Sequence, residues 1–200
     1  VNIAIIGKYV NLKDAYKSLD EALTHGGISN KVKVNLIRIE SDKLKPNQIS
    51  KKLKDVSGLL IPGGFGKRGT EGKISAIKYA REKKIPFLGI CFGMQMAIIE
   101  FARNKLKIKR AGSTELDKNC YPVIGLIEEW SKDGKIIKGT DKDLGGTMRL
   151  GLYEAKLRNN SAIKKIYKSN SIKERHRHRY EVNNNLNIQF EKKGLIFSGM

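Results

Sequence analysis

The sequence has few of the features that mark membrane, secreted or disulfide-linked proteins. Its 200 residues include two cysteines, four prolines and one tryptophan, and no apolar run approaches the roughly 18 residues of a membrane-spanning helix. Two cysteines without metal-ligand spacing argue against a disulfide scaffold and favour a reducing compartment, so we expect a cytoplasmic location. The chain begins without methionine in a strand-like segment and has no signal-peptide pattern. We expect it to have been cut from a longer chain.

Acidic residues are also scarce. The chain has 20 Asp and Glu against 40 Lys and Arg, which gives a formal net charge of +20. Such a charge is compatible with a nucleic-acid partner. However, the lysines are spread through all the helix-like segments with few aromatic residues among them, so a solvated basic surface explains the charge more simply. A non-enzymatic nucleic-acid-binding module is therefore an alternative, and we expect neither a nucleic-acid nor a membrane partner.

The pattern of apolar residues predicts a single α/β domain over residues 1–200. With 40% hydrophobic residues, the chain can bury one substantial core. Strands are predicted near residues 1–6, 32–36 and 58–61, with a helix that ends at Gly26-Gly27 and another over residues 70–83. The expected fold is a three-layer α/β sandwich with a mostly parallel central sheet. Strand-like pieces between residues 121 and 157, with turns at Asp133-Gly134 and Gly145-Gly146, indicate an antiparallel excursion from that sheet.

The most informative segment is a strand-like run followed by the sequence G-I-C-F-G at residues 89–93, after which helical character begins. A tight strand-to-helix turn needs such glycines, because their missing Cβ lets backbone segments approach closely. A helix N-terminus favours the thiolate of Cys91, and backbone N–H groups beside it can bind an oxyanion. Most lone cysteines are small buried apolar residues, so the flanking glycines are what favour a nucleophile here.

A second glycine-rich loop, P-G-G-F-G at residues 62–66, follows the predicted strand at residues 58–61. It lacks the lysine and hydroxyl ending of a P-loop and the spacing of a dinucleotide fingerprint. Loops after parallel strands meet at the carboxyl edge of the sheet, so Gly63 and Gly64 are expected beside Cys91. We therefore expect this loop to supply a second oxyanion donor.

Later in the chain, Arg alternates with His or Tyr over residues 175–180. This alternation predicts a strand with Arg175, Arg177 and Arg179 on one face. The other face would carry His176, His178 and Tyr180. A solvated charged strand is the simplest alternative to a functional one.

Five motifs, in order, resemble the glutaminase domain of the CTP synthase family, and the resemblance covers essentially the whole chain. They are the two glycine-rich segments above, G-S-T-E at residues 112–115, G-G-T-M-R-L-G at residues 145–151, and E-R-H-R-H-R-Y-E-V-N at residues 174–183. The first two are shared by class I glutamine amidotransferases generally. The last two are similar to CTP synthases in particular.

The resemblance implies that Cys91 attacks the side-chain amide of L-glutamine and releases ammonia through a thioester. The N–H groups of Gly64 and Phe92 would hold the oxyanion. Three residues match positions that bind the ends of glutamine: Gln95, Glu115 and Arg179. Outside the motif context, Gln95 would be read as an exposed helix residue and Glu115 as a helix-start or surface acid.

The family further implies activation by GTP and a separate synthetase domain. Thr147 and Arg149 match positions implicated in GTP activation, and Arg68 is grouped with them. The ammonia would pass to UTP in an N-terminal synthetase domain that uses ATP and Mg, and the parent enzyme would be a homo-oligomer, a tetramer. No cofactor or metal is expected in this domain itself.

One departure from the family pattern concerns the general base. The family carries its catalytic histidine and glutamate in a His-Pro-Glu motif near the carboxyl end. The histidines of this chain are His25, His176 and His178, and none precedes Pro-Glu. We expect the motif to lie beyond Met200; otherwise His176 or His178 is the base to test. A different cysteine amidotransferase or hydrolase of the same fold stays open, because an elbow alone does not name a substrate.

Overall fold

The computed structural model describes residues 1–12, 14–126, 129–132, 135–138 and 148–200. The chain forms two compact units, Val1–Phe101 and Ala102–Met200. The expectation of a single domain over residues 1–200 stays a prediction.

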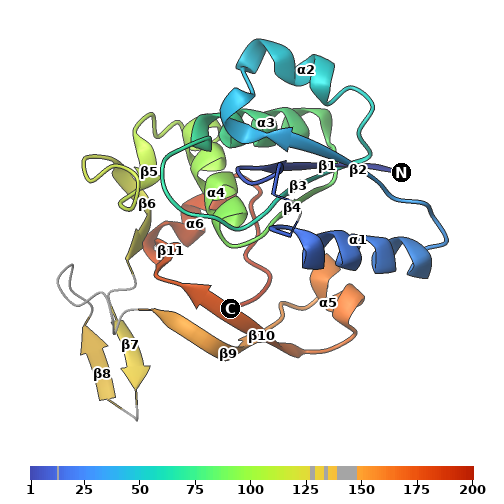
Figure 1. Ribbon diagram of the computed structural model, residues 1–200. Coiled ribbons are helices and arrows are strands. Elements are labelled where there is room, and N and C mark those ends of the chain that lie inside the picture. Colours follow the sequence, from blue (N-terminus) through green and yellow to red (C-terminus); the bar gives the residue numbers. More distant parts are fainter. Residues whose placement is uncertain (13, 127–128, 133–134, 139–147) are drawn as a thin grey trace. The chain divides into compact units, whose positions relative to one another are not determined.

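The first unit is built on a parallel sheet with the strand order β2-β1-β3-β4. Its strands are β1 (Asn2–Gly7), β2 (Asn35–Glu40), β3 (Gly58–Ile61) and β4 (Phe87–Gly89). Its helices are α1 (Lys17–Ser29), η1 (Ser41–Lys43), η2 (Pro46–Gln48), α2 (Ile49–Lys52), α3 (Thr70–Lys83) and α4 (Phe92–Asn104), which ends just past the unit boundary. Helix α1 lies on one side of the sheet, and α2 and α3 lie on the other (Figure 1). The predicted three-layer arrangement is confirmed.

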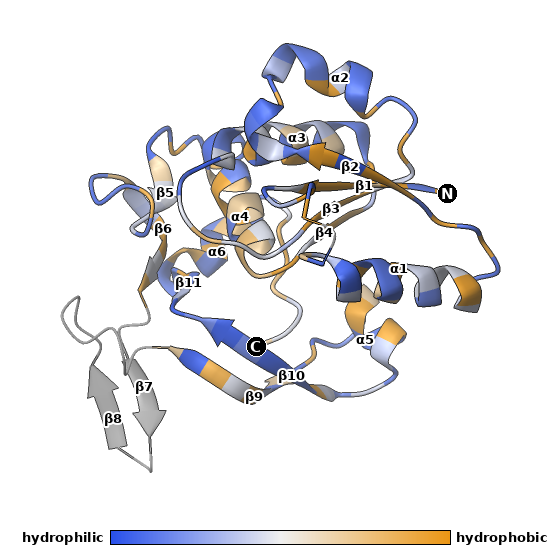
Figure 2. Cartoon of the chain, in the orientation of Figure 1, coloured by the Kyte–Doolittle hydropathy of each residue, from blue (hydrophilic) through white to orange (hydrophobic). Residues whose placement is uncertain are grey.

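Two inner strands form the centre of this unit. β1 and β3 are strongly hydrophobic (Figure 2), and β3 is buried at all four positions. Strands covered on both faces are expected to be continuous apolar runs, as these are. In the adjoining core, Tyr16 is buried against Ile5 and Leu60, and Leu19 and Leu23 of α1 pack on the same cluster.

Two boundaries in this unit differ from the sequence prediction. Helix α1 continues through Gly26 and Gly27 to Ser29, so the prediction that these glycines end it is wrong. The chain then turns sharply, because the N–H of Val32 donates to the carbonyl oxygen of Gly27 at 2.9 Å. Residues 32–34 lie outside the strand, and β2 begins only at Asn35.

Helices α3 and α4 of the first unit are joined by an ion pair. Arg81 donates from Nε to Oε2 of Glu100 at 2.9 Å and from Nη2 to Oε1 at 2.8 Å. Glu100 is 1% exposed, whereas Arg81 lies partly in solvent. A carboxylate this deeply buried depends on such a two-point partner.

The second unit contains short sheets and small helices. Its strands are β5 (Ala111–Ser113), β6 (Tyr121–Leu126), β7 (Glu129–Lys132), β8 (Lys135–Lys138), β9 (Arg149–Lys156), β10 (Ser171–His178) and β11 (Tyr180–Val182). Its helices are α5 (Ala162–Tyr167), η3 (Asn184–Leu186) and α6 (Asn187–Lys192). Antiparallel pairing of β7 with β8 and of β9 with β10 confirms the predicted excursion. The predicted turns at residues 133–134 and 145–146 lie outside the described residues.

The basic strand of the second unit follows its prediction up to His178. Along β10, Arg175 and Arg177 are exposed and His176 and His178 are half-buried, and the strand is hydrophilic over most of its length (Figure 2). The prediction is wrong for Arg179, which is half-buried in the bend after the strand. β10 pairs with β9 whereas β11 pairs with β6, so the chain changes sheets at this bend and the alternation stops.

Candidate active site

The predicted nucleophile lies in a strained turn between β4 and α4. Cys91 has a φ of 51°, in the left-handed region that L residues other than glycine rarely adopt. On one side of it, the N–H of Ile90 donates to the carbonyl oxygen of Ile61 on β3 at 3.0 Å. On the other side, the carbonyl oxygen of Cys91 accepts from the N–H of Gln95 at 3.1 Å, which starts the hydrogen-bonding of α4. The half-buried thiol is thus held at a sharp strand-to-helix elbow.

The two flanking glycines are required by close backbone contacts. A Cβ atom at Gly93 would lie 2.1 Å from the carbonyl oxygen of Ile61, and one at Gly89 would lie 2.7 Å from the carbonyl carbon of Gly93. Both distances are far inside van der Waals contact with backbone atoms, which cannot move aside as a side chain does. The glycines therefore let the elbow fold tightly against β3.

Gly93→Ala is expected to lower the free energy of unfolding by about 3 kcal/mol, since it forces β3 and α4 apart. Urea unfolding of the full-length protein measures the effect. Gly26→Ala is the matched control, because nothing lies within 4 Å of a Cβ at that position in α1. It is expected to add up to about 1 kcal/mol of helix stability. A Gly93→Ala protein as stable as the wild type would contradict the packing requirement.

The glycine-rich loop after β3 lies beside the nucleophile. A Cβ at Gly63 would be 3.8 Å from the Cβ of Cys91. Phe92 is the first residue of α4, where backbone N–H groups have no carbonyl partner within their own helix. The geometry thus puts a glycine loop and a helix N-terminus on either side of one thiol. The roles of the Gly64 and Phe92 N–H groups as oxyanion donors stay predictions.

Two buried lysines next to the elbow were missed by the sequence reasoning. Lys8 is 6% exposed and Lys73 is 1% exposed, and their Nζ atoms lie 5.4 and 4.9 Å from the centre of the Phe92 ring. Lys8 donates to the carbonyl oxygens of Phe65 and Gly66, the latter at 2.7 Å. These contacts tie the loop after β1 to the loop after β3.

A sequence signal for one of these lysines does exist. Lys73 lies four residues before Ile77 and seven before Ala80, and both of these are buried on α3. A lysine at that spacing is on the apolar face of the helix. The signal is easily overlooked, because lysines are so numerous elsewhere in the chain.

Arg68 joins the loops at the carboxyl edge of the parallel sheet. Its Nη1 lies 2.9 Å from Oδ2 of Asp42 in η1, and its Nη2 donates to the carbonyl oxygen of Lys8 at 3.5 Å. Its guanidinium also lies 6.0 Å from the ring centre of Tyr9. Arg68 therefore connects the segments after β1, β2 and β3.

The other predicted site residues are divided between the two units. Gln95 is buried in the first turn of α4, so an exposed helix position is excluded. Glu115 is half-buried in a turn after β5, where its N–H donates to Oγ of Ser113 at 3.3 Å; it does not start a helix. Arg149 begins β9, and Arg179 occupies the bend before β11. Thr147 lies outside the described residues.

The histidines of the second unit form a compact polar cluster. Nδ1 of His176 lies 2.8 Å from Nε2 of His178, and the ring of Tyr153 packs edge-on against His176. Burial lowers the pKa of His178, and the nearby Glu181 opposes this shift. Glu181 also pairs with Nε of Arg149 at 2.9 Å. The cluster holds Arg149 at the edge of β9.

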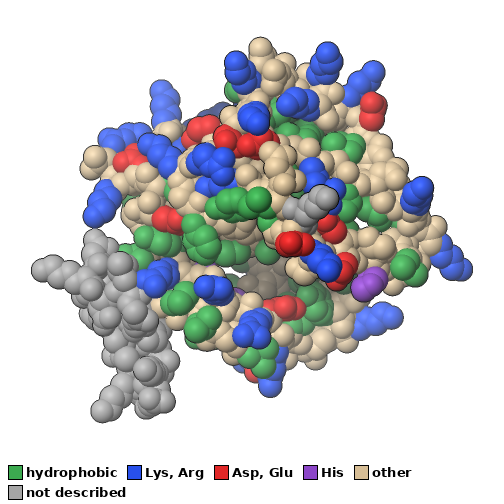
Figure 3. All heavy atoms as spheres, viewed as in Figure 1, with side chains coloured by type: hydrophobic (Ala, Val, Ile, Leu, Met, Phe, Trp, Pro, Cys, Tyr) green, Lys and Arg blue, Asp and Glu red, His purple; other side chains and the backbone are tan. Residues whose placement is uncertain are grey.

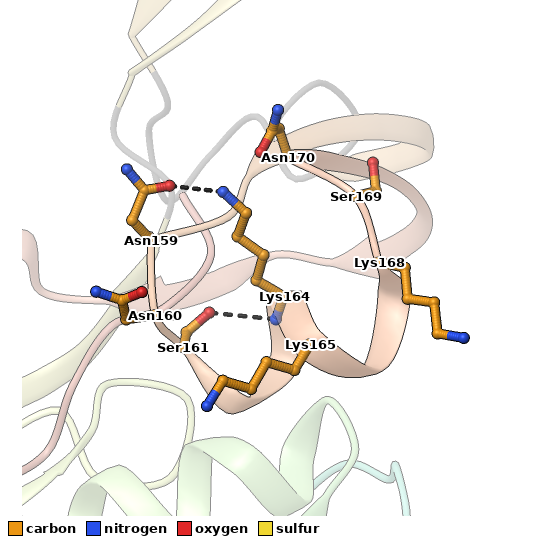
Figure 4. A pocket seen from close by; sticks show the side chains of 8 residues that line it. All are labelled: Asn159, Asn160, Ser161, Lys164, Lys165, Lys168, Ser169 and Asn170. Atoms are coloured by element: carbon orange, nitrogen blue, oxygen red, sulfur yellow. Dashed lines mark hydrogen bonds between the residues drawn. The ribbon is translucent and has the colours of Figure 1, made fainter.

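A separate hollow in the second unit contains none of the predicted site residues. Its volume is about 380 Å³, and asparagine, serine and lysine side chains around α5 line it (Figure 4). Lys164 dominates one wall, where its Nζ donates to Oδ1 of Asn159 at 2.6 Å and its N–H donates to Oγ of Ser161 at 3.2 Å. These two hydrogen bonds are local to α5 and the residues just before it, and they account for the position of the Lys164 side chain.

Three observations bear on the alternatives of a metal site, a membrane-spanning segment and a nucleic-acid interface. In the part of the chain that the structure describes, no group of three or more His, Cys, Asp or Glu is arranged to hold a metal ion. No helix among the described residues has the length and apolar character to cross a membrane. Lys and Arg side chains are dispersed over the visible face rather than gathered in one patch (Figure 3). This dispersal does not favour a nucleic-acid interface.

Comparison with known proteins gives consistent matches. Residues 11–200 match the family Glutamine amidotransferase class-I. A CTP synthase from Pelagibacter ubique is 76% identical over 200 residues, and one from Methylobacterium radiotolerans is 57% identical over 201. Both matches cover all of this chain but 37% of the relative, so the chain spans little more than a third of these proteins.

A solved structure extends the likeness to three dimensions. The glutaminase domain of Trypanosoma brucei CTPS with bound acivicin superposes with a TM-score of 0.86 at 34% identity. The match covers all of this chain and 74% of that one. Together with the cysteine elbow, these matches show that the chain belongs to the class I glutamine amidotransferase family, in the branch formed by the glutaminase domains of CTP synthases.

Proposed function

We propose that the chain hydrolyses L-glutamine at Cys91 and supplies the ammonia for amination of UTP to CTP. The observation that carries this proposal is the left-handed backbone of Cys91, between a buried sheet and a helix N-terminus and beside Gly63. A φ of 51° turns the thiol out of the strand direction at an energetic cost. Strain of this kind is typical of nucleophiles on strand-to-helix elbows.

The proposed reaction has two steps at the thiol. The Cys91 sulfur attacks the side-chain carbonyl carbon of glutamine, the C–N bond breaks, and ammonia leaves as a thioester forms. Water then cleaves the thioester to give glutamate and regenerate the thiol. N–H groups of Gly64 and Phe92 would stabilise the oxygen that becomes negative in each step. The proton for the leaving ammonia would come from a histidine general base of the kind that the family carries in its His-Pro-Glu motif.

The ends of the substrate would be held by polar residues at positions that match the glutamine-binding residues of the family. A guanidinium is the natural partner of the glutamine α-carboxylate, which suits Arg179. Gln95 and Glu115 carry oxygen atoms suited to the α-ammonium group. The trypanosome relative has acivicin bound, and acivicin is a glutamine analogue, which supports a glutamine-like ligand here by relationship.

The remaining parts of the proposal concern the parent protein. We infer an N-terminal synthetase domain that uses ATP and Mg, activation by GTP, a tetrameric assembly and a cytoplasmic location. The 76% identity to a CTP synthase supports these features by relationship. Assays of glutamine-dependent and ammonia-dependent CTP formation by the full-length protein, with and without GTP, test the catalytic part. Absence of CTP formation from either nitrogen source would favour a different amidotransferase.

For GTP activation, Arg149→Ala is expected to raise the GTP concentration needed for half-activation about tenfold, since one charge-assisted contact to a phosphate is worth roughly 1.5 kcal/mol. Ammonia-dependent synthesis should not change. Arg177→Ala is the matched control, because Arg177 is an exposed arginine on β10, the strand that pairs with β9. An unchanged GTP response in Arg149→Ala would mean that Arg149 has only a structural role, through its contacts with Glu181 and Tyr153.

A further inference from the structure

The ammonium group of Lys73 lies against both segments that flank the nucleophile. Its Nζ is 4.9 Å from the centre of the Phe92 ring, and a Cβ at Gly64 would lie 3.9 Å from it. Phe92 directly follows Cys91, and Gly63 lies beside Cys91. A side chain that is 1% exposed thus brings a positive charge to the place where the two predicted oxyanion donors meet.

The surroundings of this ammonium leave its charge poorly compensated. Among the described residues, the Nζ atom of Lys73 lies over the Phe92 ring and makes no hydrogen bond to an oxygen atom. The charged groups that face it are Lys8 after β1, Asp42 in η1 and Arg68 after β3. Asp42 is already paired with Arg68 at 2.9 Å. A negative charge formed nearby is therefore stabilised by Lys73 more than it would be in water.

The lowered pKa of Lys73 agrees with a poorly compensated buried charge. The pKa of Lys73 is lowered from 10.5 to about 8, mainly by burial and then by the nearby charges of Lys8 and Arg68, while Asp42 opposes the shift. A folded-state pKa below the unfolded value means that the protonated side chain disfavours folding at pH 7. Stability should then increase as the pH rises above about 8. A side chain that disfavours folding beside a reactive group is a candidate for a functional role.

We propose that Lys73 is a positioning residue whose buried positive charge stabilises the Cys91 thiolate and the oxyanion that forms between Gly64 and Phe92. For its relevance to glutamine, this inference rests on the proposed function. For its effect on the thiol, it rests on the geometry of the elbow alone. The lysine forms no covalent bond and transfers no proton in this role.

The test is the pH dependence of Cys91 alkylation by iodoacetamide in the full-length protein, followed by mass spectrometry of the Cys91 peptide. Lys73→Met keeps the length of the side chain and removes its charge. We expect the alkylation midpoint to rise by about one pH unit, the order of effect of one nearby charge in a protein interior. Below both midpoints, Cys91 should react about tenfold more slowly. Cys120, on the second unit, is the internal reference and should not change.

Matched variants separate the charge from the packing. Lys78→Met removes an exposed lysine from the same helix and should leave the midpoint of Cys91 unchanged. Lys73→Arg keeps a charge and should retain most of the reactivity. At pH 7, Lys73→Met should be at least as stable as the wild type, because an unfavourable buried charge is gone. A purely structural lysine predicts the opposite pair of results, lower stability and an unchanged midpoint.

The outcomes keep this inference distinct from the proposed function. An unchanged Cys91 midpoint in folded Lys73→Met would overturn the role of the lysine, whether or not the wild type hydrolyses glutamine. A shifted midpoint in a protein without glutaminase activity would support the role and reject the proposed substrate. If Lys73→Met did not fold, the expected stability would be wrong, and Lys73→Gln would supply the midpoint measurement.

Discussion

Cys91→Ser in the full-length protein is expected to reduce glutamine-dependent CTP formation at least about 10⁴-fold, since a hydroxyl at neutral pH is a far weaker nucleophile than a thiolate. Ammonia-dependent CTP formation should remain at the wild-type rate, because free ammonia bypasses the thiol. The two rates are measured in parallel on one preparation. Retention of glutamine-dependent turnover would remove Cys91 from the reaction.

The second cysteine provides the control for this substitution. Burial raises the pKa of the Cys120 thiol, and the nearby Asp117 raises it further. Cys120 therefore has little thiolate at pH 7 and should be inert. Cys120→Ser is expected to leave both rates unchanged. A large loss of the glutamine-dependent rate in this variant would show that general damage, not nucleophile loss, explains the result at position 91.

Arg81→Ala is expected to lower the free energy of unfolding by about 3–5 kcal/mol, because it removes the two-point partner of the buried Glu100 carboxylate. The loss corresponds to a decrease of about 10 °C in the melting temperature. Both quantities are measured on the full-length protein by urea and thermal unfolding. The change lies away from the elbow, so the activity per folded molecule should persist.

Two further variants show whether the buried pair is responsible. Glu82→Ala removes a half-exposed carboxylate 3.7 Å from the same Arg81, and it should change stability by less than about 1 kcal/mol. The double variant Arg81→Met with Glu100→Leu replaces the pair by apolar side chains and should recover most of the loss. A double variant no better than Arg81→Ala would indicate that packing around α3 and α4, rather than an uncompensated charge, sets the effect.

Local signals explain which parts of the fold could be predicted from the sequence. Helix α3 begins and ends where the pattern places it, because Gly69 and Lys84 take left-handed conformations at its two ends. The predicted end of α1 is too early, since Gly26 and Gly27 suggest a helix stop but Asn30 supplies the observed cap. The bend at Arg179 depends on which strands pair, and pairing is not visible in a local pattern.

The residues of the candidate site also differ in whether the sequence alone could predict them. Cys91 and its glycines are predictable, because the tight turn imposes a local requirement at each position. Lys73 and Lys8 are not, since their burial depends on how loops after different strands meet above the Phe92 ring. Glu100 is a similar case, because its partner Arg81 is on another helix. Residues that depend on long-range contacts need the three-dimensional arrangement before a role can be assigned.

Position 91 places catalysis and stability under opposite evolutionary pressures. At a φ of 51°, glycine would avoid a backbone strain of about 1 kcal/mol that cysteine carries, and asparagine would reduce it. Under the proposed function, selection for glutamine hydrolysis would keep the cysteine. In a descendant released from that selection, substitutions should drift towards glycine or asparagine, while valine, isoleucine and threonine stay excluded by their branched Cβ. The residue at this position would then distinguish a homologue that has lost the hydrolytic activity from one that has only diverged in sequence.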